Sequence, residues 1–214
     1  AAAWQLAQLP PQLLAGIGPE LNNGLKEYET IQNDLAERAE ANFNLAMLYE
    51  RSGRSEQVEP ALRAALARNE EYLPARVTLF QWLEANGGDA EARQVLTDGL
   101  RRQPTSGLLH HVNGLALVRQ GQHAQALKEL REAVRLAPDD DQFRFVLAVA
   151  LHDGGDVDGA CHELETLLQK HPANRSARLV LIDYLREAGQ FQKVQQFTAE
   201  LEQQNPDDPA LKRE

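Results

Sequence analysis

Residues 107–140 read GLLHHVNGLALVRQGQHAQALKELREAVRLAPDD, and these 34 residues contain one full copy of the pattern that organises the chain. Apolar residues recur at helical intervals in the first half, as at Leu115 and Val118, and again after the central glycine, as at Leu127 and Leu130. A glycine suits the left-handed backbone conformation that ends many helices. The stretch therefore predicts two amphipathic helices joined by a tight turn.

The same spacing of glycines and prolines recurs along most of the chain. An Asp, Asn or Thr follows closely after the prolines and is expected to begin the next helix. The glycines lie 34 residues apart at Gly53, Gly87, Gly121, Gly155 and Gly189, and the prolines lie 34 residues apart at Pro104, Pro138, Pro172 and Pro206. Aligned on this period, the chain gives five units, residues 39–72, 73–106, 107–140, 141–174 and 175–208.

One helical hairpin of this length cannot bury its own apolar face, so we expect the copies to stack. Small residues recur in the second helix at Ala92, Ala126 and Ala160, which lets paired helices approach closely. The pattern resembles the tetratricopeptide repeat (TPR) family, whose repeat has the same length. The resemblance covers residues 39–208 and implies an all-α, right-handed superhelical solenoid of helix-turn-helix hairpins. The first unit departs from the pattern, because Pro60 lies about one turn inside its second helix.

Residues 1–38 and 209–214 do not follow the period. The stretch PPQLLAGIGPE separates a helix predicted near Ala1–Leu9 from a helix predicted from Pro19 to about Arg38. We interpret residues 1–38 as a helical cap on the first unit or as the remnant of a preceding helical domain, and residues 209–214 as a C-terminal tail. The chain begins AAAWQLAQLPPQLL, without a Met or a signal-peptide core, so we expect it to be a piece of a longer protein.

Composition and motifs argue against several classes of function. The chain has 32 Asp and Glu against 22 Lys and Arg, a net charge of −10, which argues against binding to nucleic acid. It has no run of about 18 apolar residues that would insert into a membrane. Its single cysteine, Cys161, permits no intrachain disulfide. The sequence contains no nucleotide-binding or hydrolase motif, so we predict no enzymatic activity, no catalytic residue and no cofactor.

Three groups of residues imitate metal sites without completing one. His110 and His111 are neighbours on one predicted helix and point to different sides, with no ligand three or four residues away. We interpret them as packing or lining residues at the fourth and fifth positions of their unit. The run HELET, from His162, has Thr166 where a zinc-protease helix needs its second histidine. The run GGDVDGACHELE has Gly154 where a calcium loop needs its first ligand, so no metal site is predicted.

What remains is a surface. In TPR proteins the second, fifth, ninth and twelfth positions of each first helix line a concave groove, and the resemblance carries this role over to the present chain. The fifth and ninth positions are Phe43, Met47, Val77, Gln81, His111, Leu115, Phe145, Val149, Leu179 and Asp183, with Glu50, Glu84 and Arg186 towards the ends of the groove. Most of the ten are apolar, so we expect a protein or peptide partner with an apolar or amphipathic segment. The carboxylate clamp of chaperone-binding TPRs needs Lys and Asn at these positions and finds neither, which disfavours a free C-terminal carboxylate. Alternatively, part of the stripe packs on the N-terminal segment.

A narrower resemblance suggests a narrower role. The segments LHHVNGLALVRQGQHAQALKELREAVRLAPDD, FRFVLAVALHDGG and GLKEYETIQNDLAERAEANFNLAMLY are similar to the C-terminal TPR region of bacterial multihaem c-type cytochrome proteins. That resemblance implies a periplasmic protein in which this chain is the interaction arm, although the chain has no CxxCH haem motif. A cell-envelope, pilus or secretion assembly factor is a second alternative, and a cytoplasmic location stays open. Phe191 and Phe197 also allow self-association through an apolar end.

Overall fold

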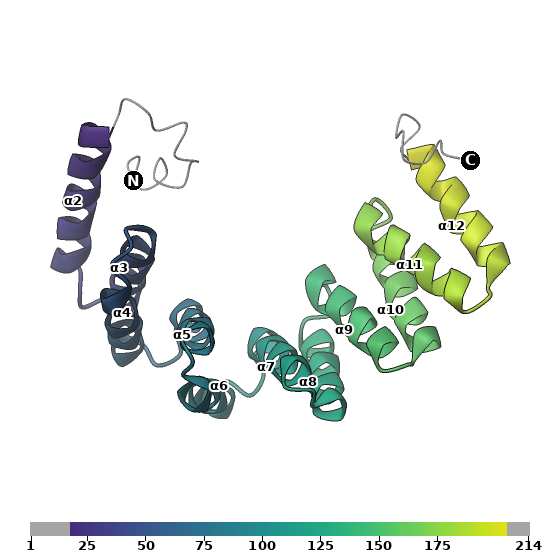
Figure 1. Ribbon diagram of the computed structural model, residues 1–214, viewed down its shortest axis with the longest axis horizontal. Helices are drawn as coiled ribbons and strands as arrows, with labels where there is room; N and C mark the ends of the chain where they lie inside the picture. The colour runs from purple at the N-terminus through teal and green to yellow at the C-terminus, as the bar shows by residue number, and fades with distance from the viewer. Residues whose placement is uncertain (1–17, 205–214) are drawn as a thin grey trace. The chain divides into compact units, whose positions relative to one another are not determined.

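The computed structural model describes residues 18–204 and places them in eleven α-helices, with no strand among them. The helices are α2 (Gly18–Asp34), α3 (Ala39–Arg51), α4 (Ser55–Arg68), α5 (Leu73–Ala85), α6 (Asp89–Arg102), α7 (Gly107–Arg119), α8 (His123–Leu136), α9 (Asp141–Asp153), α10 (Val157–Lys170), α11 (Arg175–Glu187) and α12 (Phe191–Gln204). The all-α fold class is therefore confirmed for these residues (Figure 1). The helix predicted near Ala1–Leu9 and the tail at residues 209–214 lie outside them.

From α3 onward the helices form five hairpins with a common turn. Three residues separate the two helices of each hairpin, and the glycine of that turn has a positive φ, from 69° at Gly189 to 85° at Gly155. In the third hairpin the amide of Gln122 donates to the carbonyl of Leu117 at 2.9 Å and closes the end of α7 around Gly121. Residues with a Cβ rarely adopt this φ, which is why glycine repeats there. The left-handed glycines predicted at this position are confirmed.

A short link follows each second helix and caps the next first helix. The side-chain oxygens of Ser106, Asp140 and Asn174 accept hydrogen bonds from backbone amides three residues later, at 3.4, 3.0 and 3.0 Å. These caps satisfy donors that the first turn of a helix leaves free. The predicted Asp and Asn caps are confirmed for α9 and α11, whereas α7 uses Ser106 instead of Thr105, because Ser106 stands directly before the helix.

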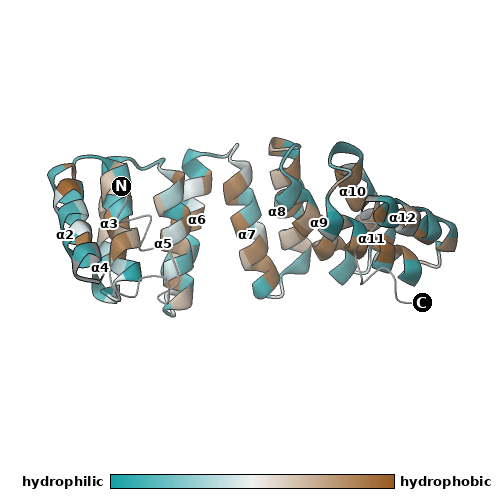
Figure 2. Cartoon of the chain, turned by 90° about the horizontal axis from the view of Figure 1, so that it is seen from above, coloured by the Kyte–Doolittle hydropathy of each residue, from teal (hydrophilic) through white to brown (hydrophobic). Residues whose placement is uncertain are grey.

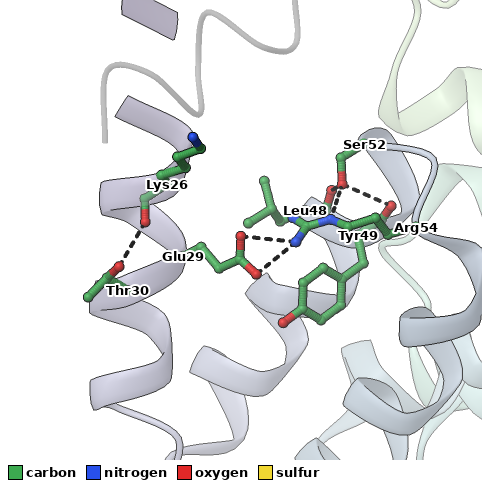
Figure 3. A network of polar contacts seen from close by, with 7 residues as sticks. All are labelled: Lys26, Glu29, Thr30, Leu48, Tyr49, Ser52 and Arg54. Carbon is green, nitrogen blue, oxygen red and sulfur yellow. Dashed lines mark hydrogen bonds and ion pairs between the residues drawn. The ribbon is translucent and has the colours of Figure 1, made fainter. Parts of the chain in front are cut away.

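The chain divides into two compact units, unit 1 (residues 1–104) and unit 2 (residues 105–214), and each is described by itself. In unit 1, α2 packs against α3. Arg54, in the turn after α3, donates to Glu29 of α2 at 2.8 and 3.0 Å, and its guanidinium lies 4.6 Å from the centre of the Tyr49 ring (Figure 3). These contacts make α2 part of the stack.

α2 ends at Asp34, before the predicted end at Arg38. Arg38 has φ −99° and ψ 140°, an extended conformation in which it precedes α3, so a continuous helix cannot pass through it. Asn42 holds this link, because its side-chain amide donates to the carbonyls of Ala36 at 2.7 Å and Arg38 at 2.8 Å. The end of α2 at residue 34 falls one period before the end of α4 at residue 68, so this helix follows the repeat that its sequence did not reveal.

In unit 2 the core runs from one hairpin to the next. Buried Leu130 and Phe143 lie in one cluster formed by α8, α9 and α10, and buried Leu164 and Leu181 lie in a second cluster formed by α9, α10 and α11. Figure 2 shows hydrophobic and hydrophilic residues alternating along these helices, as expected where each helix buries one face. A core shared only between neighbouring hairpins is typical of a solenoid.

Candidate functional site

The predicted groove residues lie on the first helices of the hairpins and fall into two groups. The two groups belong to the two compact units of the chain. Unit 1 contains Phe43, Met47, Val77 and Gln81, and unit 2 contains His111, Leu115, Phe145, Val149, Leu179 and Asp183.

In unit 1 the apolar members of the group are partly accessible. Phe43, Met47 and Val77 are half-buried, and Gln81 is exposed. The Phe43 ring meets the Tyr72 ring edge-on, with centroids 5.8 Å apart and an angle of 75° between the planes. Such an arrangement is favourable for aromatic rings and holds Phe43 in place. The second and twelfth positions of α3 and α5 add carboxylates to this surface at Glu40, Glu50 and Glu84.

In unit 2 the first helices present a longer row of apolar side chains, which we define as the first-helix row: Leu108, Leu115, Phe145, Val149 and Leu179. Leu108 is 38% exposed and the other four are half-buried. Phe145 is also anchored, because it packs against the buried cluster of α9, α10 and α11. Leu108 was not among the ten predicted residues. It occupies the second position of its unit, seven residues before Leu115, and helical spacing places these two leucines on one face.

Two stacked ring pairs join the three first helices of unit 2. The ring of His111 in α7 lies on that of Phe143 in α9, with centroids 4.4 Å apart and 20° between the planes. The ring of His152 in α9 lies on that of Tyr184 in α11, with centroids 3.8 Å apart and 1° between the planes. The first-helix row is therefore carried on helices that contact one another directly.

His111 differs from the prediction that it lines the groove. Its side chain is buried, at 6% exposed, and its Nδ1 has no hydrogen-bond partner. Burial lowers the pKa of the imidazole, and Asp140 opposes this shift more weakly. The Phe143 ring covers the imidazole, so the fifth position of this unit serves the contact between hairpins and not a partner.

His110 points to the second helix of its own hairpin. Its Nδ1 lies 2.7 Å from Oε2 of Glu129. One period later Arg144 takes the place of His110 and pairs with Glu163, which takes the place of Glu129. His110 thus makes the contact within its own hairpin that the fourth position also makes in the next unit.

The fourth position has a second structural task that sequence reasoning missed. In several units its side chain donates to the backbone carbonyl six residues earlier, in the link between hairpins, and so fastens each first helix to the preceding second helix. The donors and acceptors are Asn42 to Ala36 at 2.7 Å, Arg76 to Glu70 at 2.5 Å, Arg144 to Pro138 at 3.4 Å and Arg178 to Pro172 at 2.5 Å.

A hollow opens beside the first-helix row at the N-terminal ends of α9 and α11. It has a volume of about 460 Å³, room for an apolar side chain of a partner. Apart from Phe145 its wall is polar. The lining residues are Asp141, Gln142, Phe145, Asn174 and Ser176.

Charged groups border the row at the opposite ends of the same helices. His152 Nε2 lies 2.6 Å from Oε2 of Glu187, and Asp183, the exposed ninth-position residue of α11, pairs with Arg186 at 2.8 Å. Burial raises the pKa of Tyr184, and the nearby carboxylates, Glu187 among them, raise it further. The row therefore has an apolar middle and polar borders.

Residues 18–204 contain no group of three or more His, Cys, Asp or Glu placed to hold a metal ion. Cys161 is buried, and burial raises the pKa of its thiol, so the thiol is protonated at neutral pH. Within the same range, no helix combines the length and the apolar character that a membrane crossing requires. The first-helix row is therefore a surface for contact with another molecule, with apolar side chains at its centre and polar groups around them.

Three family models match the chain, each for the tetratricopeptide repeat, over residues 39–72, 112–163 and 151–213. No curated protein sequence matches it. Among solved structures, the MamA protein is 13% identical with a TM-score of 0.65, and the match covers 82% of this chain and 96% of that one. YrrB, a TPR protein with an unusual peptide-binding site, is 21% identical with a TM-score of 0.60, over 86% and 94% of the two chains. The pilF protein of Pseudomonas aeruginosa is 19% identical with a TM-score of 0.64, over 83% and 80%. At these identities the likeness shows the fold alone.

Proposed function

Since this chain belongs to the tetratricopeptide repeat family, whose fold is that of a protein-interaction scaffold, we propose that it is a non-enzymatic scaffold that binds an apolar or amphipathic segment of a protein partner. The observation that carries the proposal is the first-helix row of unit 2. Four of its residues are half-buried and Leu108 is 38% exposed, so the row presents apolar surface on a rigid support.

The binding energy comes from covering this surface. Full burial of an exposed leucine or phenylalanine side chain stabilises by about 1.5–3 kcal/mol, so covering the exposed minority of each side chain in the row contributes less than about 1 kcal/mol. Several such side chains acting together, with the apolar surface of the segment that covers them, supply the favourable part of the free energy of association. Phe145 is the central anchor, because it is an aromatic residue held by the core and it also borders the hollow.

The chemistry of the borders selects the kind of segment. Gln142 and Ser176 in the hollow wall offer hydrogen-bonding groups, and Asp183 and Arg186 lie exposed at the other end of the helices. An amphipathic segment satisfies these groups with its polar side while its apolar side covers the row. None of the fifth positions is a lysine, so a free carboxylate is not the anchor in this proposal.

A peptide-display selection on the immobilised chain tests the proposal. We expect enrichment of segments with apolar residues at helical or alternating spacing, and Phe145→Ala should weaken their binding about tenfold, which corresponds to about 1.4 kcal/mol. Phe191→Ala is the matched control, because Phe191 is a more exposed phenylalanine, at 65%, on the second helix α12. Selected peptides that are uniformly charged, or that bind the Phe145→Ala chain unchanged, contradict the proposal.

The narrower roles remain expectations from resemblance. This chain would use the same row either as the interaction arm of a periplasmic multihaem cytochrome or as an envelope assembly factor. The two roles differ in the parent protein to which the chain would belong. The intact mass of the endogenous protein, measured beside a haem-stained gel, separates them, since only the first carries covalent haem.

A further inference from the structure

α2 occupies the place of a second helix whose own first helix is not among the described residues. Its end at residue 34 lies one period before the end of α4 at residue 68. By the same spacing Tyr28 and Ile31 correspond to Leu62 and Ala65 of α4. Figure 1 shows α2 beside α3 at the start of unit 1.

The corresponding residues of the complete hairpins are buried, whereas those of α2 are not. Ile31 is 47% exposed. Its equivalents are 0–1% exposed, at Ala65, Ala133, Leu167 and Leu201. Leu35, which directly follows the last residue of α2, is a further exposed apolar residue, at 38%. Among the described residues only four large apolar side chains are this exposed, and two of them are Ile31 and Leu35.

The missing cover is the first helix of the same hairpin. In the third hairpin Leu130, the equivalent of Tyr28, packs on Gly114 of its own first helix so closely that a Cβ on Gly114 would lie 2.7 Å from it. The opposite side of α2 packs against α3, because Gln32 is 8% exposed and accepts a hydrogen bond from the side chain of Asn44 in α3. The face with Ile31 therefore has the shape and the chemistry of a site for an apolar segment.

We propose that residues 1–17 of this chain cover that face and supply the packing that a first helix provides in the complete hairpins. These residues run directly into α2, so their local concentration at the face is high and docking costs little association entropy. They contain no Asp, Glu, Lys or Arg, which suits an apolar site. Their large apolar residues are Trp4, Leu6, Leu9, Leu13, Leu14 and Ile17.

The charges of α2 favour this occupant over a second copy of the chain. Glu27 is exposed beside Tyr28, whereas the Glu29 carboxylate is held in its pair with Arg54. Two copies of α2 packed face to face would bring the two Glu27 carboxylates together and lose free energy by repulsion. A segment without charges does not meet this penalty. The proposal favours one of the two interpretations of residues 1–38, a cap on the first hairpin, over the remnant of a preceding helical domain.

The test uses the full chain of 214 residues with Trp82→Phe, which leaves Trp4 as the single tryptophan. We expect Trp4 emission to be blue-shifted and several-fold less quenched by acrylamide than in a peptide of residues 1–17. Ile31→Asp should remove most of this protection, and Leu35→Asp should remove part of it. Leu108→Asp is the control, because Leu108 is as exposed as Leu35 but lies in unit 2. Circular dichroism shows that each variant is folded.

Three results would overturn the proposal. The first is a Trp4 that is as open to quencher in the parent chain as in the peptide. The second is protection that survives both Ile31→Asp and Leu35→Asp. The third is protection that disappears on dilution as light scattering reports dissociation of a dimer, which assigns the face to a second copy. Protection that is lost in Ile31→Asp, kept in Leu108→Asp and independent of concentration supports residues 1–17 as the occupant.

Discussion

Gly114 is the place where the packing of a hairpin tolerates no added atom, and Gly114→Ala tests this directly. A Cβ at this position would lie 2.7 Å from both Cγ and Cδ2 of Leu130 and 3.3 Å from its backbone nitrogen. Leu130 is fully buried, so its side chain cannot swing away, and the backbone contact means that α8 itself must shift. Overpacking of this kind costs about 1–3 kcal/mol.

Alanine is also a better helix former than glycine, which offsets part of that cost. The gain is about 1 kcal/mol in a helix interior. Because two side-chain atoms and a backbone atom are all too close, we place the cost of overpacking in its upper range and expect a net loss of about 1–2 kcal/mol in the free energy of unfolding. Urea denaturation followed by circular dichroism measures this loss.

Gly154→Ala is the matched control. Gly154 ends α9 with φ −81°, and its added Cβ would meet no atom closer than 3.4 Å. We expect a change within about 0.5 kcal/mol. A Gly114→Ala chain that is as stable as the Gly154→Ala chain would show that the contact between Gly114 and Leu130 leaves room for a methyl group. Leu130→Ala adds a second check, because the cavity it leaves should accept the new methyl group and make the double variant more stable than the sum of the two single changes predicts.

Other predictions concern the first hairpin, the buried histidine and the links. Pro60→Ala should raise the free energy of unfolding by up to about 3 kcal/mol in urea denaturation, since Pro60 lies inside α4 and cannot donate a helical hydrogen bond. Burial lowers the folded-state pKa of His111 from its ordinary value of 6.5, so as pH drops below that value the unfolded chain binds the proton first and stability should fall. A smaller slope of stability against pH in His111→Phe than in the parent supports this, and equal slopes contradict it. Arg178→Ala should lower the free energy of unfolding by about 3 kcal/mol, because the Arg178 side chain is 1% exposed, donates to the Pro172 carbonyl and pairs with Glu200. Arg186→Ala should lower it by less than about 1 kcal/mol, because Arg186 is exposed. Similar losses of stability in thermal melts of the two variants would contradict the role of the fourth position.

Much of the fold could be predicted because its strongest signals are local. The turn glycines show as a spacing in the sequence, since only glycine readily takes the positive φ found at Gly121 and its equivalents. The Asp140 and Asn174 caps bind amides only three residues away. α2 was placed too long because its end depends on Arg38 and Asn42, whose conformation and contacts belong to the junction with α3.

The candidate site was a prediction from the resemblance to the TPR family, whose groove positions include Phe145 and Val149, and both are half-buried in the structure. The same carry-over also selected His111, whose burial depends on the Phe143 ring in the next hairpin. A repeat pattern places equivalent residues on equivalent helix faces. It does not predict which of these residues is covered by a side chain of a neighbouring hairpin.

The helices, their turns, their pairing into hairpins and the family could all be predicted from the sequence, because they follow from backbone preferences and from apolar spacing within one period. Which apolar residues are accessible depends instead on how the helices pack. Ile31 and Ala65 occupy the same place in the period, yet one is 47% exposed and the other 0%. Ala65 lies in α4, which packs on the first helix of its own hairpin, α3, whereas no such first helix for α2 is among the described residues. Burial is a property of neighbours in space and not of position along the chain.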